Sequence, residues 1–283
     1  MLPSSDAPRR QNERETVDAN RRFYASVAKD YDRLEECALD ERLQRRLRAK
    51  LDLALALVRR ERIRALDACG GSGNASLMLH VLGVTPTTVD VSREMLDQYE
   101  CKASARGLEA RTHLADIAEF LAVEDAEWDL IVFSSALHHL EDYESVLDRA
   151  VRRLAPGGVI VTLFDPTETS RVGRRLRRVD YAVHVVLREP RRAAVLIRRR
   201  LRRSPPDAAS VAGARAERHA LHGIDDIGVR RRLEADGLEI VDHERTYDGR
   251  YRAIRFLFRL LRAPSSYSLV ARRASLERPG RTA

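Results

Sequence analysis

Short apolar runs alternate with helical patterns along the chain from residue 64 onward. This alternation is typical of a parallel β-sheet with helices on both faces. It predicts seven strands, at residues 64–69, 85–90, 111–115, 128–133, 158–164, 238–247 and 266–272. The intervening helices are expected mainly at residues 74–81, 93–105, 143–154 and 224–235.

Two helical patterns precede this core, and one long segment interrupts it. Residues 11–32 and 40–60 read as helices, the second with leucine at every fourth position from Leu43 to Leu55. Nearly 60 residues separate the fifth and sixth strands, which is too long for an ordinary connection. We therefore predict an N-terminal helical cap (1–60), a core (61–165), a basic helical insertion that forms a lid (166–222) and a C-terminal completion of the sheet (223–283).

Composition changes this picture in two respects. No apolar run is long enough to span a membrane, the N-terminus is polar, and the three cysteines lack paired spacing, so we expect a cytoplasmic protein without a metal site. The net charge of +8 is local, because residues 171–203 alone carry +11 and the rest of the chain sums to −3. The excess of arginine over lysine also fits a bias in genome composition.

The first strand runs into a glycine-rich turn at residues 66–74. Glycines keep side chains away from such a strand-to-helix turn, so a ligand can approach backbone N–H groups. Counting from Gly71, the third glycine of the NAD fingerprint falls at Ser76, which argues against an NAD-linked reductase. Taken alone, the turn also fits simple tight packing.

Two carboxylates strengthen the prediction of an adenosine-containing cofactor. Asp90 ends the second strand, nineteen residues after Gly71, where it can accept hydrogen bonds from both hydroxyls of a ribose. Asp116 follows the third strand and is placed to hold an adenine amino group, with Met95 against the ring. An alternative role for Asp116 is the N-cap of the next helix.

With these motifs in order, the chain resembles the class I S-adenosylmethionine (SAM)-dependent methyltransferases, in the broad group that includes quinone and small-molecule methyltransferases. The resemblance implies a Rossmann-like, doubly wound α/β fold. It covers roughly residues 20–165, through matches at residues 23–32, 67–73, 89–92, 116, 128–132, 136–140 and 154–158.

The resemblance also implies the roles of individual residues toward SAM. Asp67 would support the methionine amino group through the loop, Gly71 and Gly73 would face the methionine moiety, Asp90 would bind the ribose, and Asp116 and Ile117 would hold adenine. Tyr24 and Tyr31 would close over the cofactor, although lid packing is an equal alternative for Tyr24. We add Ser134, directly after the fourth strand, to the predicted cofactor-binding residues.

One position departs from the family pattern. Two residues after Asp67 the family usually has glycine, whereas this chain has Cys69, with glycine displaced to Gly70. Cysteine is small enough for the turn, and its simplest role is that of a small buried apolar side chain.

Methyl transfer from a sulfonium is an in-line displacement, so the enzyme mainly aligns the nucleophile and excludes water. A hydroxyl or acidic-carbon acceptor must also lose a proton. His138 and His139, just past the fourth strand, are the candidate bases, and Asp165 at the end of the fifth strand could face the acceptor. Alternatively the histidines shape the loop, and Asp165 with Pro166 forms only a turn.

Basic amphipathic segments define the expected partners. Residues 181–187 and 193–197 are apolar stretches among arginines, and Tyr251, Ile254, Phe258 and Leu261 form a helical stripe beside Arg252, Arg255, Arg259 and Arg262. These segments fit an anionic membrane surface, a pocket for an apolar anionic acceptor, or packing on the core with solvated arginines.

We therefore expect methylation of O, N or C of a small, apolar or lipid-like metabolite, in small-molecule or natural-product biosynthesis. Nucleic acid is a weaker candidate partner, because aromatic residues for base stacking make up only 5% of the chain. The alternatives are an RNA methyltransferase and a SAM-binding adaptor without catalysis at nucleic acid or membrane. The sequence leaves the oligomeric state open.

Overall fold

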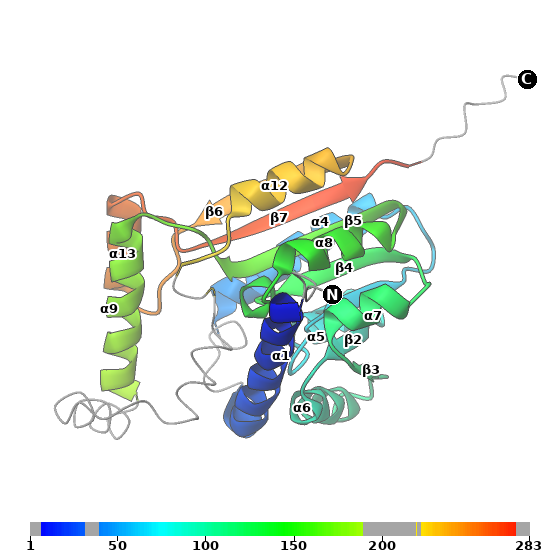
Figure 1. Cartoon of the computed structure of the whole chain (residues 1–283), viewed down its shortest axis with the longest axis horizontal. Coiled ribbons are helices and arrows are strands. Elements are labelled where there is room, and N and C mark those ends of the chain that lie inside the picture. The colour runs from blue at the N-terminus through cyan, green and yellow to red at the C-terminus, as the bar shows by residue number, and fades with distance from the viewer. Residues whose placement is uncertain (1–6, 32–39, 189–218, 220–221, 276–283) are drawn as a thin grey trace, which may run out of the picture.

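The strands form one mixed seven-stranded sheet in the computed structural model, which describes residues 7–31, 40–188, 219 and 222–275 (Figure 1). Its strand order is β3-β2-β1-β4-β5-β7-β6; β7 pairs antiparallel with both β5 and β6, and the other neighbouring strands pair parallel. The strands are β1 (Ala65–Ala68), β2 (Thr87–Asp90), β3 (Arg111–Leu114), β4 (Trp128–Ser134), β5 (Leu154–Pro166), β6 (Leu238–Thr246) and β7 (Ser266–Arg273). The predicted Rossmann-like seven-stranded architecture is confirmed.

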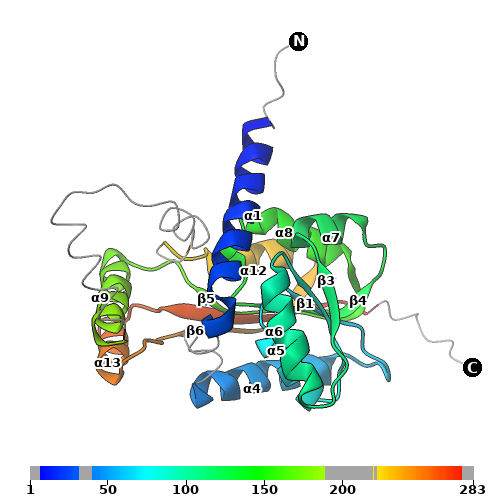
Figure 2. The same cartoon turned by 90° about the horizontal axis from the view of Figure 1, so that it is seen from below.

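Helices cover both faces of the sheet (Figure 2). They are α1 (Ala7–Val27), α4 (Glu41–Leu57), α5 (Asn74–Val81), α6 (Arg93–Ser104), α7 (Ile117–Val123), α8 (Tyr143–Arg152), α9 (Arg171–Arg188), α12 (Asp226–Ala235) and α13 (Arg252–Leu260), with short 3-10 turns η1 (Ala28–Asp30) and η2 (Leu137–His139). None of the helices within the described ranges is long and apolar enough to cross a membrane.

Two apolar layers hold these helices to the sheet. On one face, side chains of α7, α8 and α12 such as Phe120, Leu147 and Leu233 pack on the strands. On the other face, α4 and α5 contribute Leu47 and Leu79. The leucine repeat of α4 is therefore explained by burial against the sheet, whereas α1 lies across the edge of the sheet and extends past the body of the fold (Figure 2).

The described part of the predicted insertion contains α9 and its connection to the sheet. Thr167 pairs with Ile224, so the two ends of the insertion lie side by side. The apolar stretch at 181–187 lies within α9. The second stretch at 193–197, and the arginines between 191 and 203, lie outside the described residues. The limits of the four predicted parts remain predictions.

A buried carboxylate forms hydrogen bonds where the two ends of the insertion meet. Asp226, at the start of α12, is hydrogen bonded to Thr167 and accepts from Arg245 at 2.7 and 2.8 Å, while its Oδ2 lies 2.9 Å from Nε2 of His243. Burial alone would raise the pKa of Asp226, but the hydrogen bonds outweigh burial and lower that pKa to about 2.

We predict that Asp226→Asn lowers the free energy of unfolding by about 2–3 kcal/mol at neutral pH, because it leaves the buried donors without their ionised acceptor. A carboxyl whose pKa falls on folding contributes stability above its unfolded pKa, and this stability is lost as pH falls through the folded pKa. The difference between wild type and variant, measured by denaturant unfolding, should therefore shrink from about pH 4 to about pH 2. The exposed Asp236→Asn is the control; an equal loss in both variants would contradict the assignment.

Candidate functional site

A pocket of about 800 Å³ lies at the carboxyl edge of the sheet, where the strand order reverses at β1. The loop after β1, the ends of β2 and β4 and the segments that follow β3 and β4 form its floor. Helix α1 supplies the opposite wall through residues from Glu13 to Tyr24. Ligands of open α/β sheets bind in such a crevice, because the helices that follow the two central strands leave in opposite directions.

The turn after β1 needs several unusual backbone positions. A Cβ on Gly70 would lie 2.4 Å from Cγ2 of Thr88, so this glycine is required by the close approach of the neighbouring strand. Gly71 has φ +53° and lines the pocket. Cys69 adopts φ +59°, a conformation that glycine accepts without strain and cysteine does not. The departure from the family pattern thus falls on a left-handed residue.

Gly73, predicted to face the methionine moiety, lies beside the pocket and against α6. It does not line the pocket; a Cβ at this position would lie 2.1 Å from the ring of Tyr99 on α6. The absence of a side chain at Gly73 therefore lets the beginning of α5 pack against that ring.

Two carboxylates face the loop, that of the fully buried Asp67 and that of the partly buried Asp90. Asp67 accepts a hydrogen bond from Oγ of Ser76 at 2.6 Å through Oδ2, while its Oδ1 has no hydrogen-bond partner among the described residues. Asp90 accepts from the backbone N–H groups of Gly71 and Ser92, both at 2.9 Å. Burial raises the pKa of Asp67 and the pKa of Asp90 to about 6, against the opposing effect of these hydrogen bonds.

Asp116 performs the alternative role and also lines the pocket. Its Oδ1 accepts from the N–H groups of Ala118 and Glu119 at 2.9 and 3.0 Å, which caps α7. Ile117, Met95 and Ser134 line the same pocket. An N-cap carboxylate at the pocket edge keeps its second oxygen available for a ligand.

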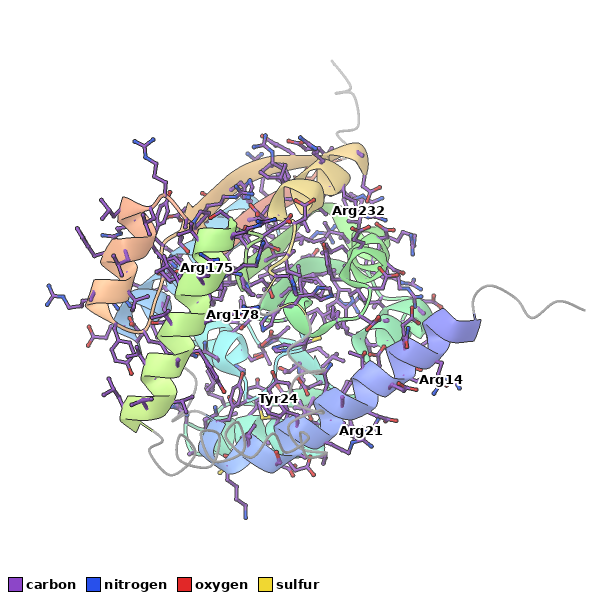
Figure 3. The ribbon with its side chains drawn as sticks, turned by 60° about the vertical axis from the view of Figure 1, so that its left-hand side comes forward. Arg14, Arg21, Tyr24, Arg175, Arg178 and Arg232 are labelled. Atoms are coloured by element: carbon purple, nitrogen blue, oxygen red, sulfur yellow. The ribbon has the colours of Figure 1, made fainter. Side chains whose placement is uncertain are left out.

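The two adjacent histidines lie in different environments, His139 at the pocket and His138 in the protein interior. His139 lines the pocket, and its Nε2 lies 2.9 Å from the hydroxyl of Tyr24, which reaches from α1 toward the body of the fold (Figure 3). His138 is buried behind it, with Nδ1 2.7 Å from Oδ1 of Asp165. The two imidazole rings lie 3.8 Å apart between centroids.

Of the predicted site residues, ten cofactor or catalytic candidates line the one pocket and three do not. Those lining it are Tyr24, Tyr31, Asp67, Gly71, Asp90, Met95, Asp116, Ile117, Ser134 and His139. Gly73, His138 and Asp165 lie outside the lining. Within the described part of residues 166–222, no residue lines this pocket.

Sequence reasoning missed the polar face of α1. Thr16 donates to Glu141 and Asn20 donates to the carbonyl of His139, each at 2.9 Å. With Tyr24, these residues repeat at four-residue spacing and place one helix face on the segment after β4. The four-residue spacing of these polar residues is a usable signal, but apolar periodicity alone does not reveal a polar face.

Comparison with known proteins identifies this arrangement. The family described as a methyltransferase domain matches residues 39–202, more than half of the chain. The chain belongs to the class I SAM-dependent methyltransferases. The match agrees with the pocket at the reversal of strand order and with the glycine turn beside Asp90.

Curated methyltransferase relatives share part of this chain. Demethylmenaquinone methyltransferase of Thermus thermophilus is 35% identical over 149 residues, which cover 51% of this chain and 64% of the relative. The tRNA 5-carboxymethoxyuridine methyltransferase of Escherichia coli K12 is 33% identical over 119 residues, covering 40% and 44%. The chain thus spans less than two thirds of the length of these relatives.

Solved structures show the same methyltransferase fold. The magnesium protoporphyrin IX methyltransferase of Synechocystis PCC 6803, solved with bound S-adenosylhomocysteine (SAH), superposes with a TM-score of 0.58 at 14% identity, over 92% of this chain and 100% of that one. A SAM-dependent methyltransferase of Clostridium acetobutylicum gives 0.53 at 14% identity, over 89% and 99%.

The residues of this methyltransferase pocket fit SAM. The unpartnered Oδ1 of Asp67 offers a buried acceptor, which an ammonium group satisfies. Asp90 retains acceptor capacity beside the glycine turn, because each carboxylate oxygen accepts more than one hydrogen bond. The carboxylates of Asp67, Asp90 and Asp116, which are among the acidic residues that line the pocket, also complement a ligand with positive sulfonium and ammonium groups.

We predict that the affinity for SAH falls as pH falls below about 6, because protonation of Asp67 and Asp90 removes the acceptors. For each carboxylate that must be ionised, its protonation should weaken SAH binding about tenfold between about pH 7 and about pH 5. Isothermal titration across this range measures the effect, and Asp90→Asn should flatten part of it. Asp97→Asn, an exposed carboxylate on α6, is the control; a flat profile in the wild type would contradict the prediction.

Proposed function

We propose that the protein transfers a methyl group from SAM to an O, N or C atom of a small, largely apolar acceptor. The observation that carries this proposal is the pocket that joins the glycine turn and Asp90 to His139 under α1. When bound, SAM supplies an activated methyl group on its sulfonium. The similarity to a demethylmenaquinone methyltransferase supports the apolar acceptor.

In this proposal, each residue in the cofactor half of the pocket contacts one part of SAM. Asp90 accepts from the ribose hydroxyls and Asp67 from the amino group, while Gly71 leaves room along the backbone. Asp116 and Ile117 hold the adenine, and Met95 packs against it. Ser134 closes this half at the end of β4.

The acceptor half is assigned to α1 and the turn after β4. Tyr24 and Tyr31 lie edge to face, with ring centroids 5.8 Å apart, and Tyr24 also packs edge to face on His139. In this arrangement the tyrosines exclude water, and His139 is within reach of an acceptor proton.

His138 and Asp165 act behind His139 as positioning residues. Asp165 accepts from the backbone N–H of His138 at 3.1 Å as well as pairing with its ring. This double contact fixes the turn, and the ring of His138 supports His139 through their close contact. The predicted catalytic role is therefore proposed for His139 alone.

We predict that Asp90→Ala weakens SAH binding at least thirtyfold, about 2 kcal/mol. The loss arises from the ribose contact and from the N–H groups of Gly71 and Ser92, which lose their acceptor. Asp97→Ala serves as the matched control in isothermal titration. Wild-type protein that is folded yet binds neither SAM nor SAH would overturn the cofactor assignment.

We predict that His139→Ala lowers kcat by about a hundredfold while the affinity for SAH changes little, because the base acts on the acceptor. Activity is read as methyl incorporation from labelled SAM into a cell extract. Tyr24→Phe should lower kcat by a smaller factor, because it removes the hydroxyl that lies 2.9 Å from Nε2 of His139 but keeps the imidazole. Equal kcat values for wild type and His139→Ala would remove the base from the mechanism.

RNA methylation is a second candidate function, favoured by the similarity to a tRNA methyltransferase and by the clustered arginines. Fractionating the labelled extract separates the candidates. Label in organic solvent supports the proposed acceptor, and label in RNA supports the second candidate. Cofactor binding without any incorporation would indicate an adaptor.

A further inference from the structure

Helices α9 and α13 pack side by side and form one end of the molecule (Figures 1 and 2). Ile254 and Phe258 are buried on the inner face of α13, with Leu176 of α9 packed against them. Arg177 donates to the carbonyls of Thr167 and Ser265, which ties α9 to the strand ends. These contacts account for Ile254 and Phe258 of the apolar stripe predicted at 251–261, and Tyr251 packs against them, whereas Leu261 is exposed.

A second apolar stripe on α13 is not accounted for by packing among the described residues. Phe256 and Leu260, one turn apart on the outer face, are 64% and 62% exposed. Val172 and Val179 of α9, two turns apart, are also exposed. Exposed apolar side chains that recur along adjoining helices mark a surface for contact with a partner or membrane.

Arginines surround this outer stripe. Phe256 lies in an open groove of about 500 Å³ whose other lining residues are Arg42, Arg252, Arg255 and Arg259. On α9, Arg175 and Arg178 are exposed on successive turns (Figure 3).

Carboxylates are almost absent from these two helices. Helix α13 contains no acidic residue. The single carboxylate of α9, Asp180, is buried and accepts from the backbone N–H of Arg250. The positive charge of the surface is therefore not neutralised within the two helices themselves.

We propose that this α9–α13 surface docks the protein on an anionic lipid membrane. Phe256 and Leu260 enter the boundary between headgroups and acyl chains, while Arg252, Arg255 and Arg259 bind lipid phosphates. This membrane proposal does not depend on the identity of the methyl acceptor.

Two other occupants match the surface less well. A second copy of the chain would place arginine against arginine, which costs energy without facing carboxylates. Nucleic acid would engage the guanidinium groups but would leave Leu260 and the valines without a matching apolar surface.

Vesicle flotation of the full chain tests the proposal. Wild type should float with vesicles of phosphatidylcholine containing about one-third phosphatidylglycerol, and not with pure phosphatidylcholine. Raising the salt concentration should reduce the floating fraction, because it screens the arginines. Two double variants, Phe256→Ser with Leu260→Ser and Arg252→Gln with Arg259→Gln, should each lower the partition coefficient about tenfold, or about 1.4 kcal/mol.

Matched control variants remove exposed apolar side chains or arginine charges at positions away from α9 and α13. Val81→Ser with Val123→Ser changes two exposed apolar residues, and Arg230→Gln with Arg231→Gln removes two exposed charges. These variants should float like wild type, and all variants should retain their affinity for SAH, which reports folding and the cofactor site separately.

Four results would overturn the membrane proposal. They are absence of flotation, equal flotation with neutral vesicles, equal losses in the control variants, and flotation that survives both surface double variants. Binding of a single-stranded RNA oligonucleotide that depends on Arg252 and Arg259 but not on Phe256, without vesicle binding, would instead assign the surface to nucleic acid. Dimerisation abolished by Phe256→Ser, again without vesicle binding, would assign it to a second copy.

Discussion

The parallel placement of β1 between β2 and β4 is the constraint on which the rest of the structure depends. It brings the carboxyl ends of three strands to one edge and leaves a crevice between the helices that follow them. The pairing of Ala68 with Val89 sets the glycine turn beside Asp90. If β1 slipped by one residue, the side chain of Asp67 would turn to the other face of the sheet. The pocket therefore depends on the register of β1 with its neighbours.

This crevice holds its carboxylates at a cost to folding. Asp67 is fully buried and Asp90 partly so, burial raises the pKa of both, and one oxygen of Asp67 lacks a hydrogen bond among the described residues. Cys69 adds a left-handed backbone conformation that disfavours a side chain. Strained backbone and unsatisfied acceptors gathered at one turn are typical of a site built to receive a ligand.

The sheet and most of the residues of the candidate cofactor site were predictable from the chain, because both depend on local order. Strands β1, β4, β5 and β7 were marked by apolar runs, and Asp90 and Asp116 stand at or just after the ends of the shorter strands β2 and β3. The direction of β7 was not predictable, since an antiparallel strand has the same pattern as a parallel one. Nor was the position of α4, because its leucine repeat specifies an apolar face but not the surface against which that face packs.

The sequence by itself determined which residue types lie at the carboxyl edge and that a glycine turn precedes them. Only the tertiary structure decided that His139 faces the pocket while its neighbour His138 pairs with buried Asp165, because adjacent residues on a short turn point in different directions. Likewise, Gly73 contacts Tyr99 from a helix twenty-six residues away in sequence. The outer position of Phe256 depends on which face of α13 meets α9. These outcomes arise from contacts between distant segments, and the packing of one element against another is not encoded in the pattern of either alone.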